Sequence, residues 1–321
     1  MNIESVKLVV THDNCPDGLA SAMIIRDILP DVEIKFVQHN TEDHKSLTPQ
    51  SGILFVDFSP FVPVVTGPDG KKILDPEVLA AWGASGSQIL DHHKTSKPII
   101  DAFGNNGRFG DEVLHHGVCG AFLAYDHIWA PNRPDNFNCH LVHKFARLAG
   151  VRDTWVRDSV FWNEACRQSE ILSFIPKERW LGIPLIQHLK NWQEQYEWIG
   201  EILEVKNINR IDKTVDGGYR FVSNKGTRVI IFEGITATSD ACEKMGSEFD
   251  LVVGHGSFVE SGNLVTVFST RSHSDFDCSA FCKKHGGGGH TKAAGFKIVN
   301  SVDSLHPVSE FIRILNNYEA I

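Results

Sequence analysis

The chain contains 321 residues, of which 42% are hydrophobic and 22% are charged. At roughly 100–200 residues per domain, this length predicts two domains that can each bury a core, and the composition excludes a disordered chain. The formal charge of −9 argues against a broad basic surface for long nucleic acid, and no apolar stretch reaches the length of about 18 residues that a membrane span needs.

The first hundred residues alternate strand and helix signals. Four short apolar runs predict strands, at residues 7–10, 34–37, 53–58 and 89–90. Helical spacing of apolar residues over 18–29 predicts a helix that stops at Pro30. Buried strands separated by helices are typical of a mainly parallel sheet with helices on its faces. Residues 62–76, rich in proline and glycine, predict a loop.

The middle of the chain turns helical, and strand signals return toward the C-terminus. Helices are predicted at residues 120–129, 139–149, 185–205 and 276–284. Further strands are predicted at residues 219–222, 228–232, 251–253, 264–268 and 296–299. We therefore predict an α/β fold with an N-terminal domain over 1–190, a helical linker over 191–217 and a smaller C-terminal α/β domain over 218–321.

The cysteines and the N-terminal residues predict a cytoplasmic protein. Seven scattered cysteines do not form the even set of a disulfide framework. The first four residues lack the basic stretch and apolar run of a signal peptide. A reducing compartment is the simplest location for such a chain.

Polar side chains follow three of the predicted strands. The first strand runs into His12-Asp13-Asn14-Cys15-Pro16-Asp17-Gly18, the third ends at Asp57, and the fourth runs into Asp91-His92-His93. Because ligands of open parallel sheets bind at the carboxyl ends of strands, we expect these groups to share one crevice. Asp153, from a helical segment, is the expected fourth contributor. Taken singly, an aspartate at a strand end is more often a helix cap or a turn former than a functional residue.

Several carboxylates in one crevice would repel one another and lose hydration. Divalent cations relieve both penalties. Mixed carboxylate and imidazole ligands suit Mn²⁺ and similar ions better than Ca²⁺, and Mg²⁺ is compatible through water-rich coordination. Two such ions about 3.5–4 Å apart can clamp a phosphoryl group. The pattern therefore predicts a two-metal site for phosphate chemistry.

A run of four glycines near the C-terminus, Gly286-Gly287-Gly288-Gly289, precedes His290. Glycines let backbone N–H groups approach an anion closely, and a helix after them would favour phosphate at its N-terminus. A flexible turn is the alternative. Arg271 and His290 would add directional donors to the same anion.

A zinc site is a rival interpretation of the same region. Its ligands would be Cys278, Cys282, His285 and His290, but this spacing is not one of the common zinc patterns. The two cysteines are four residues apart on a predicted helix, which is more typical of core positions.

In this order, the motifs resemble those of the DHH-family phosphoesterases. Asp91-His92-His93 is similar to the triplet that names the family, residues 12–18 to its first motif, Asp57 to its second and Asp153 to its fourth. The glycine run with His290 resembles the signature of the DHH-associated domain, and residues 269–272 resemble its substrate-arginine strand. The chain looks most like the branch of short oligoribonucleases and nucleotide phosphodiesterases.

The resemblance implies a two-manganese phosphoesterase. Asp57 would bridge both ions, His12 and Asp13 would complete one site, and the other site would be completed by Asp17, His92 and Asp153. Relatives commonly place acidic residues two apart in the first motif, whereas here Cys15 stands between Asp13 and Asp17. The sequence therefore leaves open which of these groups ligate directly, and whether Cys15 is a bystander or a weak ligand.

The resemblance also implies roles in catalysis and substrate binding. His93 would contact the scissile phosphate or protonate the leaving oxygen, and Asp91 would orient the histidines. The expected substrate-binding residues are Arg271, Gly287, Gly288, Gly289, His290 and, facing the crevice, His116.

The implied activity is hydrolysis of very short oligonucleotides, or of linear dinucleotides such as pGpG, to mononucleotides. One alternative is a phosphatase of 3′,5′-bisphosphate nucleotides or pyrophosphate-like compounds. Another, from a different class, is a nucleotide sensor without catalysis. The expected partners are a short nucleotide substrate and a second copy of the chain in a homodimer, with no long nucleic acid and no membrane.

Overall fold

The computed structural model describes residues 2–111, 117–133, 138–260, 262–300 and 306–320. The chain divides into two compact units, Met1–Glu204 and Val205–Ile321. The division falls within residues 191–217, inside helix α12 (Glu197–Asp216). Within the ranges that the model describes, every helix is too short or too polar to cross a lipid bilayer.

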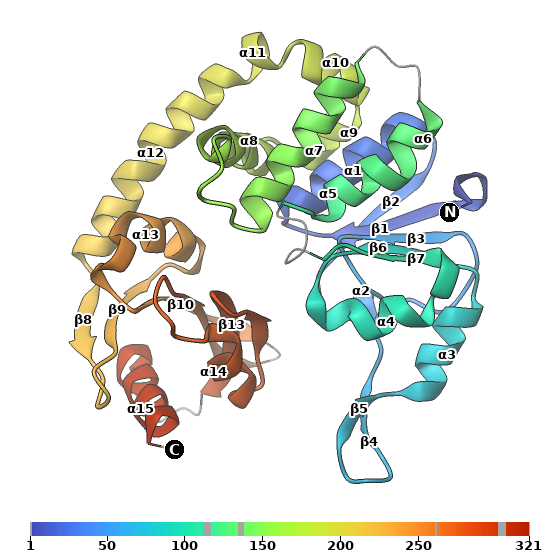
Figure 1. The fold of residues 1–321 in the computed structure, drawn as a ribbon. Helices are drawn as coiled ribbons and strands as arrows, with labels where there is room; N and C mark the ends of the chain where they lie inside the picture. The colour runs from blue at the N-terminus through green and yellow to red at the C-terminus, as the bar shows by residue number, and fades with distance from the viewer. Residues whose placement is uncertain (1, 112–116, 134–137, 261, 301–305, 321) are drawn as a thin grey trace. The chain divides into compact units, whose positions relative to one another are not determined.

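The N-terminal unit is built around a sheet of five parallel strands (Figure 1). The strand order is β2-β1-β3-β6-β7, so β3 lies at the centre between β1 and β6. Successive side chains of a strand point to opposite faces; Phe55 packs in one apolar cluster, and its neighbours Leu54 and Val56 pack in another. The strands are β1 (Leu8–His12), β2 (Glu33–Val37), β3 (Ile53–Val56), β6 (Gln88–Asp91) and β7 (Gly107–Phe109).

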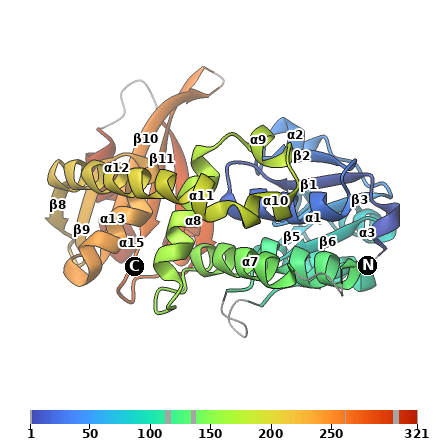
Figure 2. The ribbon, with the colours of Figure 1, turned by 90° about the horizontal axis from the view of Figure 1, so that it is seen from above.

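Helices cover both faces of this sheet. The helices of the N-terminal unit are α1 (Pro16–Ile28), α2 (Glu42–Lys45), α3 (Pro76–Ala84), α4 (Lys97–Ala102), α5 (Gly120–Ala124), α6 (Ala130–Asn132), α7 (Cys139–Asp153), α8 (Trp162–Phe174), α9 (Lys177–Leu181), α10 (Leu185–Lys190) and α11 (Trp192–Gln195). Helices α1, α5 and α7 lie on one face, where Figure 2 views them from above, and α3 and α4 lie on the other. The three-layer α/β architecture agrees with the fold predicted from the sequence.

The excursion expected as a loop contains a hairpin. Strands β4 (Val64–Thr66) and β5 (Lys72–Leu74) pair antiparallel, and Gly70 in the connecting turn has a φ of 80°, which favours glycine. The hairpin projects away from the main sheet (Figure 1). Pairing between two short strands therefore gives order to a segment whose composition only indicates a turn.

A single helix over residues 185–205 is a wrong prediction. The segment forms α10, α11 and the start of α12, with breaks at Asn191 and Tyr196. The Tyr196 hydroxyl lies 2.6 Å from Nδ1 of His188, and both rings pack against Trp180. Tertiary packing of these aromatic rings overrides the local helical periodicity.

The C-terminal unit is built around a mixed sheet with the strand order β12-β13-β11-β10-β9-β8. Helices α14 and α15 cover one face, where Phe268 and Phe281 pack with the fully buried Cys278 and Cys282. These two cysteines are core residues, as the alternative to the zinc interpretation predicts. Ile230 packs on the opposite face with α13. The elements are β8 (Tyr219–Val222), β9 (Arg228–Glu233), α13 (Thr238–Met245), β10 (Leu251–Glu260), β11 (Asn263–Arg271), α14 (Cys278–Lys284), β12 (Gly288–His290), β13 (Ala293–Asn300) and α15 (Pro307–Glu319).

The glycine run is not followed by a helix, which corrects that expectation. Its second half forms strand β12, which is paired with β13. A Cβ atom at Gly287 would lie 2.1 Å from the carbonyl oxygen of Gly295, and one at Gly289 would lie 2.6 Å from that of Ala293. Close approach of two backbones therefore requires these glycines, in addition to any role toward an anion.

Candidate metal centre

The polar groups that follow separate strands meet at one edge of the N-terminal sheet. His12 is the last residue of β1, Asp57 follows β3, and Asp91 is the last residue of β6. These three strands are neighbours and run parallel, so their carboxyl ends lie side by side. The sheet topology alone therefore gathers motifs that lie nearly eighty residues apart in the chain.

In the part of the chain that the structure describes, potential ligand atoms form three overlapping groups, and within each group they all lie within 4.8 Å of one another. The groups are His12, Cys15 and Asp57; Asp17, His92 and Asp153; and Asp57, Asp91, His92 and His93. Nε2 of His92 lies 3.2 Å from Oδ2 of Asp153 and 3.4 Å from Oδ1 of Asp57. Asp57 thus connects the donors from the first motif with those from the DHH triplet.

Asp57 has the geometry of a strained functional residue. Its φ is 53°, in the left-handed region that non-glycine residues rarely adopt. Its side chain is buried, and neither carboxylate oxygen has a hydrogen-bond partner among the described residues. Gly120 makes room for it, since a Cβ atom there would lie 2.4 Å from Cβ of Asp57. A buried carboxylate without hydrogen bonds is costly, and a bound cation reduces that cost.

The Asp17 carboxylate is held by the N-terminus of α5. Backbone N–H groups of Gly120 and Ala121 donate to its two oxygens at 2.7 and 2.8 Å. Burial, followed by the nearby charge of Asp57, raises the pKa of Asp17 to about 7. The donors leave lone pairs on both oxygens, so the carboxylate can also bind an ion.

The DHH triplet divides into two roles. Oδ1 of Asp91 accepts hydrogen bonds from the His92 and His93 backbone N–H groups and lies 2.7 Å from Nδ1 of His93. Burial lowers the pKa of His93, but Asp91 outweighs it and raises the pKa to about 9. Burial also opposes protonation of His92, yet Asp57, Asp153 and Asp17 raise its pKa well above the usual value. With Nδ1 of His93 engaged, Nε2 is the atom of that ring that can reach a substrate.

This donor set fits divalent metal ions. Among the described residues, both ring nitrogens of His92 and both oxygens of Asp57 are buried without a hydrogen-bond partner, and buried polar atoms are normally satisfied. Imidazoles and carboxylates together are ligands for ions such as Mn²⁺, Zn²⁺ and Fe²⁺. Oδ1 of Asp57 lies 3.4 Å from Nε2 of His92, so cations bound there would satisfy the Asp57 oxygens and that ring nitrogen.

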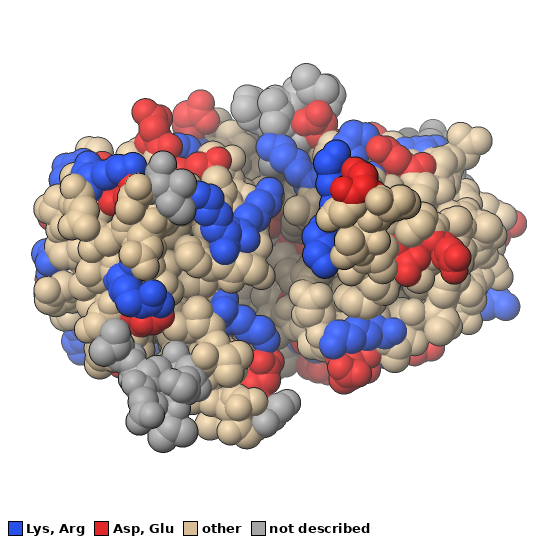
Figure 3. Space-filling model, turned by 90° about the horizontal axis from the view of Figure 1, so that it is seen from below, with Lys and Arg blue, Asp and Glu red and all other residues tan. Residues whose placement is uncertain are grey.

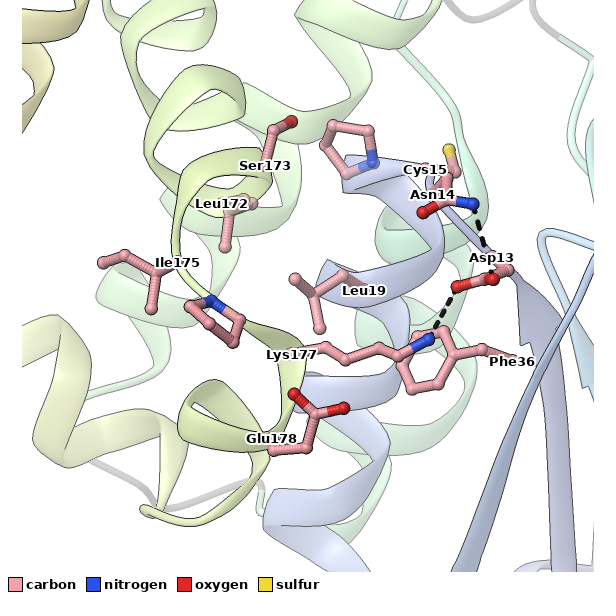
Figure 4. Close-up of a pocket in the computed structure, with 12 residues that line it drawn as sticks. Asp13, Asn14, Cys15, Leu19, Phe36, Leu172, Ser173, Ile175, Lys177 and Glu178 are labelled. Carbon is pink, nitrogen blue, oxygen red and sulfur yellow. Dashed lines mark hydrogen bonds and ion pairs between the residues drawn. The ribbon is translucent and has the colours of Figure 1, made fainter.

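The structure does not place Asp13 in any of the three donor groups. Its carboxylate accepts from Nζ of Lys177 at 2.7 Å and points toward that residue in Figure 4. The pair lies in a pocket of about 410 Å³, in which Lys177 also lies 4.5 Å from the centre of the Phe36 ring. Cys15 lines the same pocket and, on the metal side, stands within reach of His12. Cys15, and not Asp13, therefore lies beside His12 and Asp57, where the resemblance to the family implies Asp13.

One neighbour of the centre is not singled out by the sequence reasoning. His39 follows β2, and its ring stacks on Phe58 with centroids 4.4 Å apart. The His12 ring is 4.9 Å away and that of His93 is 6.5 Å away. Its position directly after a predicted parallel strand is the signal that could have identified it.

Two expected substrate residues of the C-terminal unit share one row of its sheet. Arg271 of β11 and His290 of β12 each pair with Ala293 of β13, so their side chains leave the same face, roughly 10 Å apart across two strand spacings. Nε of Arg271 donates to the Ser239 hydroxyl at 3.0 Å. His116, the remaining expected substrate residue, lies outside the described residues.

Two single variants, Asp13→Asn and Asp17→Asn, distinguish the roles of the two carboxylates in the first motif. We expect Asp13→Asn to retain metal binding and to cost about 0.2–1 kcal/mol of stability, the value of a partly exposed ion pair. Asp17→Asn is expected to weaken metal binding by about 100-fold or more, because it removes a ligand rather than an outer partner. Calorimetric titration with Mn²⁺ measures the metal affinities, thermal unfolding measures the stabilities, and equal losses of affinity in the two variants would contradict the geometry.

Comparisons with known proteins agree with this architecture. No protein-family model matches the sequence, and no curated protein is recognisably similar to it. Among solved structures, the chain is similar to a pGpG-specific phosphodiesterase, PggH, from Vibrio cholerae, with a TM-score of 0.55, 14% identity and coverage of 98% of this chain and 99% of the other. It is also similar to the DHH domain of a protein described as a member of a ribosomal protein family, with a TM-score of 0.59, 13% identity and coverage of 99% and 87%. The chain therefore has the DHH-type fold over nearly its whole length.

Proposed function

We propose that this chain is a metal-dependent phosphodiesterase that hydrolyses very short oligonucleotides, or linear dinucleotides such as pGpG, to mononucleotides. The observation that carries the proposal is the buried Asp57 carboxylate, which has no hydrogen-bond partner among the described residues and belongs to two donor groups. The fold that it shares with a pGpG-specific phosphodiesterase supports the substrate class. We propose a pair of Mn²⁺ or other divalent ions as the native cofactor, because carboxylates and imidazoles dominate the donor set.

In this proposal, His12, Asp17, Asp57, His92 and Asp153 hold the ions. Two ions bound there would activate a water molecule and neutralise charge on the phosphoryl group. Asp91 fixes the ring of His93 through Nδ1. Asp91 raises the pKa of His93 above its usual value, which favours a protonated ring that can donate a proton from Nε2 to the leaving oxygen.

The C-terminal unit would bind the terminal phosphate or base of the substrate. Arg271 and His290 leave one face of its sheet from a shared row, with the small side chain of Ala293 between them. A guanidinium can grip a phosphate in bidentate form, and an imidazole adds a second donor. Gly287 and Gly289 let the backbone of β12 approach that of β13 closely beside this row.

The charge distribution supports a short substrate. On the face that Figure 3 shows, Lys and Arg side chains are interspersed with Asp and Glu side chains, and the chain has a formal charge of −9. Long nucleic acids bind through extended basic surfaces, so a dinucleotide held by local cations and metal ions fits this surface better. A cytoplasmic location and a homodimer complete the proposal.

The proposal is tested with purified full-length protein, Mn²⁺ and four substrates. These are pGpG, a longer RNA, a 3′,5′-bisphosphate nucleotide and pyrophosphate, with products separated by chromatography. We expect GMP from pGpG and much slower release from the other three. Preferred release of phosphate from the bisphosphate nucleotide or pyrophosphate would replace the phosphodiesterase with a phosphatase. Tight binding of pGpG without any product would replace it with a sensor.

Replacement of Arg271 by alanine tests the role of the C-terminal unit. We expect KM for pGpG to rise about 10- to 100-fold, because a hydrogen bond to a charged group contributes about 1.5–3 kcal/mol, while Mn²⁺ affinity stays unchanged. Lys297→Ala, which removes an exposed cation of β13 that pairs with Glu260, is the matched control. Loss of Mn²⁺ binding in Arg271→Ala would contradict a role confined to substrate.

A further inference from the structure

The first donor group contains a thiol where the resembled motif has a carboxylate. Cys15 is the residue before α1, and its sulfur lies within 4.8 Å of donor atoms of both His12 and Asp57. Asp13, two residues before Cys15, is turned to Lys177 in the adjoining pocket (Figure 4). Among the described residues, the donors of this group are therefore one imidazole, one thiol and one carboxylate.

The spacing of this group suits one ion. Donor atoms about 2.0–2.3 Å from an ion can lie up to about 4.6 Å apart, so a small side-chain movement brings all three into coordination. The second group, formed by Asp17, His92 and Asp153, has two carboxylates and an imidazole but no sulfur. The two halves of the centre thus differ in chemical softness, and Oδ1 of Asp57 in the first half lies 3.4 Å from Nε2 of His92 in the second.

We propose that Cys15 is a thiolate ligand of the first metal position and makes the two positions unequal. The position of His12, Cys15 and Asp57 then selects a thiophilic divalent ion such as Zn²⁺, Co²⁺ or Fe²⁺, whereas the position of Asp17, His92 and Asp153 accepts Mn²⁺ or Mg²⁺. This inference rests on the metal centre of the proposed function and adds its metal selectivity. It implies that the enzyme works with a mixed pair of ions.

The bonding change is simple. When the divalent ion enters, the Cys15 S–H bond breaks, the sulfur keeps the electron pair and forms the metal–sulfur bond, and the proton leaves to solvent. No oxidant or reductant takes part.

Cobalt is the probe that tests this ligand without any assay of activity. A Co²⁺–thiolate bond gives a near-ultraviolet charge-transfer band, whereas nitrogen and oxygen ligands give only the weaker visible bands. We expect the full-length protein to show the charge-transfer band, saturating at one Co²⁺ per chain. Cys15→Asp should keep the visible bands, which shows that it folds and binds metal, and should lose the charge-transfer band. Cys15→Ser should lower Co²⁺ affinity by about 100-fold or more.

Other cysteines provide the controls. Cys139 is exposed and belongs to none of the three donor groups, so Cys139→Ser should keep the band. Cys119 is buried beside Asp17, and loss of the band in Cys119→Ser with retention in Cys15→Ser would assign the thiolate to Cys119 and overturn the proposal. Absence of the band in the unmodified protein with Co²⁺ bound would overturn it as well.

Alkylation gives a second readout, because Cys15 also lines the 410 Å³ pocket. Bound Zn²⁺ should slow modification of Cys15 at least about 10-fold, since coordination masks the nucleophilic sulfur, while the rate at Cys139 stays unchanged. Equal rates at Cys15 with and without Zn²⁺ would count against coordination. Hydrolysis of pGpG without a thiolate signal would support the proposed function and contradict this inference. A thiolate signal without hydrolysis would support the Cys15 ligand and contradict the proposed function.

Discussion

Replacement of Asp57 by asparagine is expected to reduce hydrolysis of pGpG by about 10³-fold or more. The change keeps the shape of the side chain but removes the charge that two of the three donor groups share. Losing several kcal/mol of charge stabilisation in the transition state corresponds to this factor. Single-turnover kinetics in saturating Mn²⁺, with metal content determined after equilibrium dialysis, gives the measurement.

Stability measurements separate this role from a structural one. In the metal-free protein, both Asp57 oxygens are buried without a hydrogen-bond partner among the described residues, so Asp57→Asn should leave the free energy of unfolding unchanged or raise it. Mn²⁺ at about 100 times its Kd should stabilise the native protein by about 2.7 kcal/mol and the variant by far less. Asp101→Asn, which alters only an exposed ion pair with Lys97, is the control. Near-normal turnover in Asp57→Asn would rule out a bridging carboxylate.

A second large effect is expected from Gly120→Ala. A Cβ atom at this position would lie 2.4 Å from Cβ of Asp57 and 3.0 Å from Oδ2 of Asp17. The new methyl group would clash with Cβ of Asp57 and with the Asp17 carboxylate, and the Gly120 N–H that donates to Asp17 would have to move with the backbone. We expect the variant to lose about 1–3 kcal/mol of stability through overpacking and about 10²-fold in turnover through misplaced ligands.

Thermal unfolding and Mn²⁺ titration of the same preparations check this expectation. Gly217→Ala is a matched control, because its new Cβ atom would come no closer than 3.4 Å to the carbonyl oxygen of Lys213. If Gly120→Ala binds Mn²⁺ as tightly as the unmodified protein, the metal centre tolerates a displaced α5. That result would contradict the steric requirement for glycine at this position.

Much of the fold could be predicted because local patterns and tertiary packing agree in the N-terminal sheet. The apolar runs at 34–37 and 53–58 are strands in the structure, nearly at the predicted limits. A buried parallel strand has apolar residues on both faces, so its signal survives in the sequence without knowledge of its neighbours. Because such strands run parallel, the polar residues at their carboxyl ends could be predicted to lie at one edge of the sheet.

The rest depended on contacts between distant segments. Lys177 is 164 residues from Asp13, and no local pattern indicates that the two side chains meet. The break between α10 and α12 depends on packing of Tyr196 against Trp180, which outweighs a favourable helical spacing. The glycines at 287 and 289 suggested an anion loop, whereas the structure shows that two paired strands also require them.

The sequence by itself determined the α/β architecture and the set of residues that can bind metal, because strand periodicity and donor chemistry are properties of short segments. The tertiary structure alone decided which of those donors face one another. It turned Asp13 toward Lys177 and brought Cys15 to His12 and Asp57. The direction of a side chain in a loop is set by packing and ion pairs from other parts of the chain, and these are formed only when the chain folds.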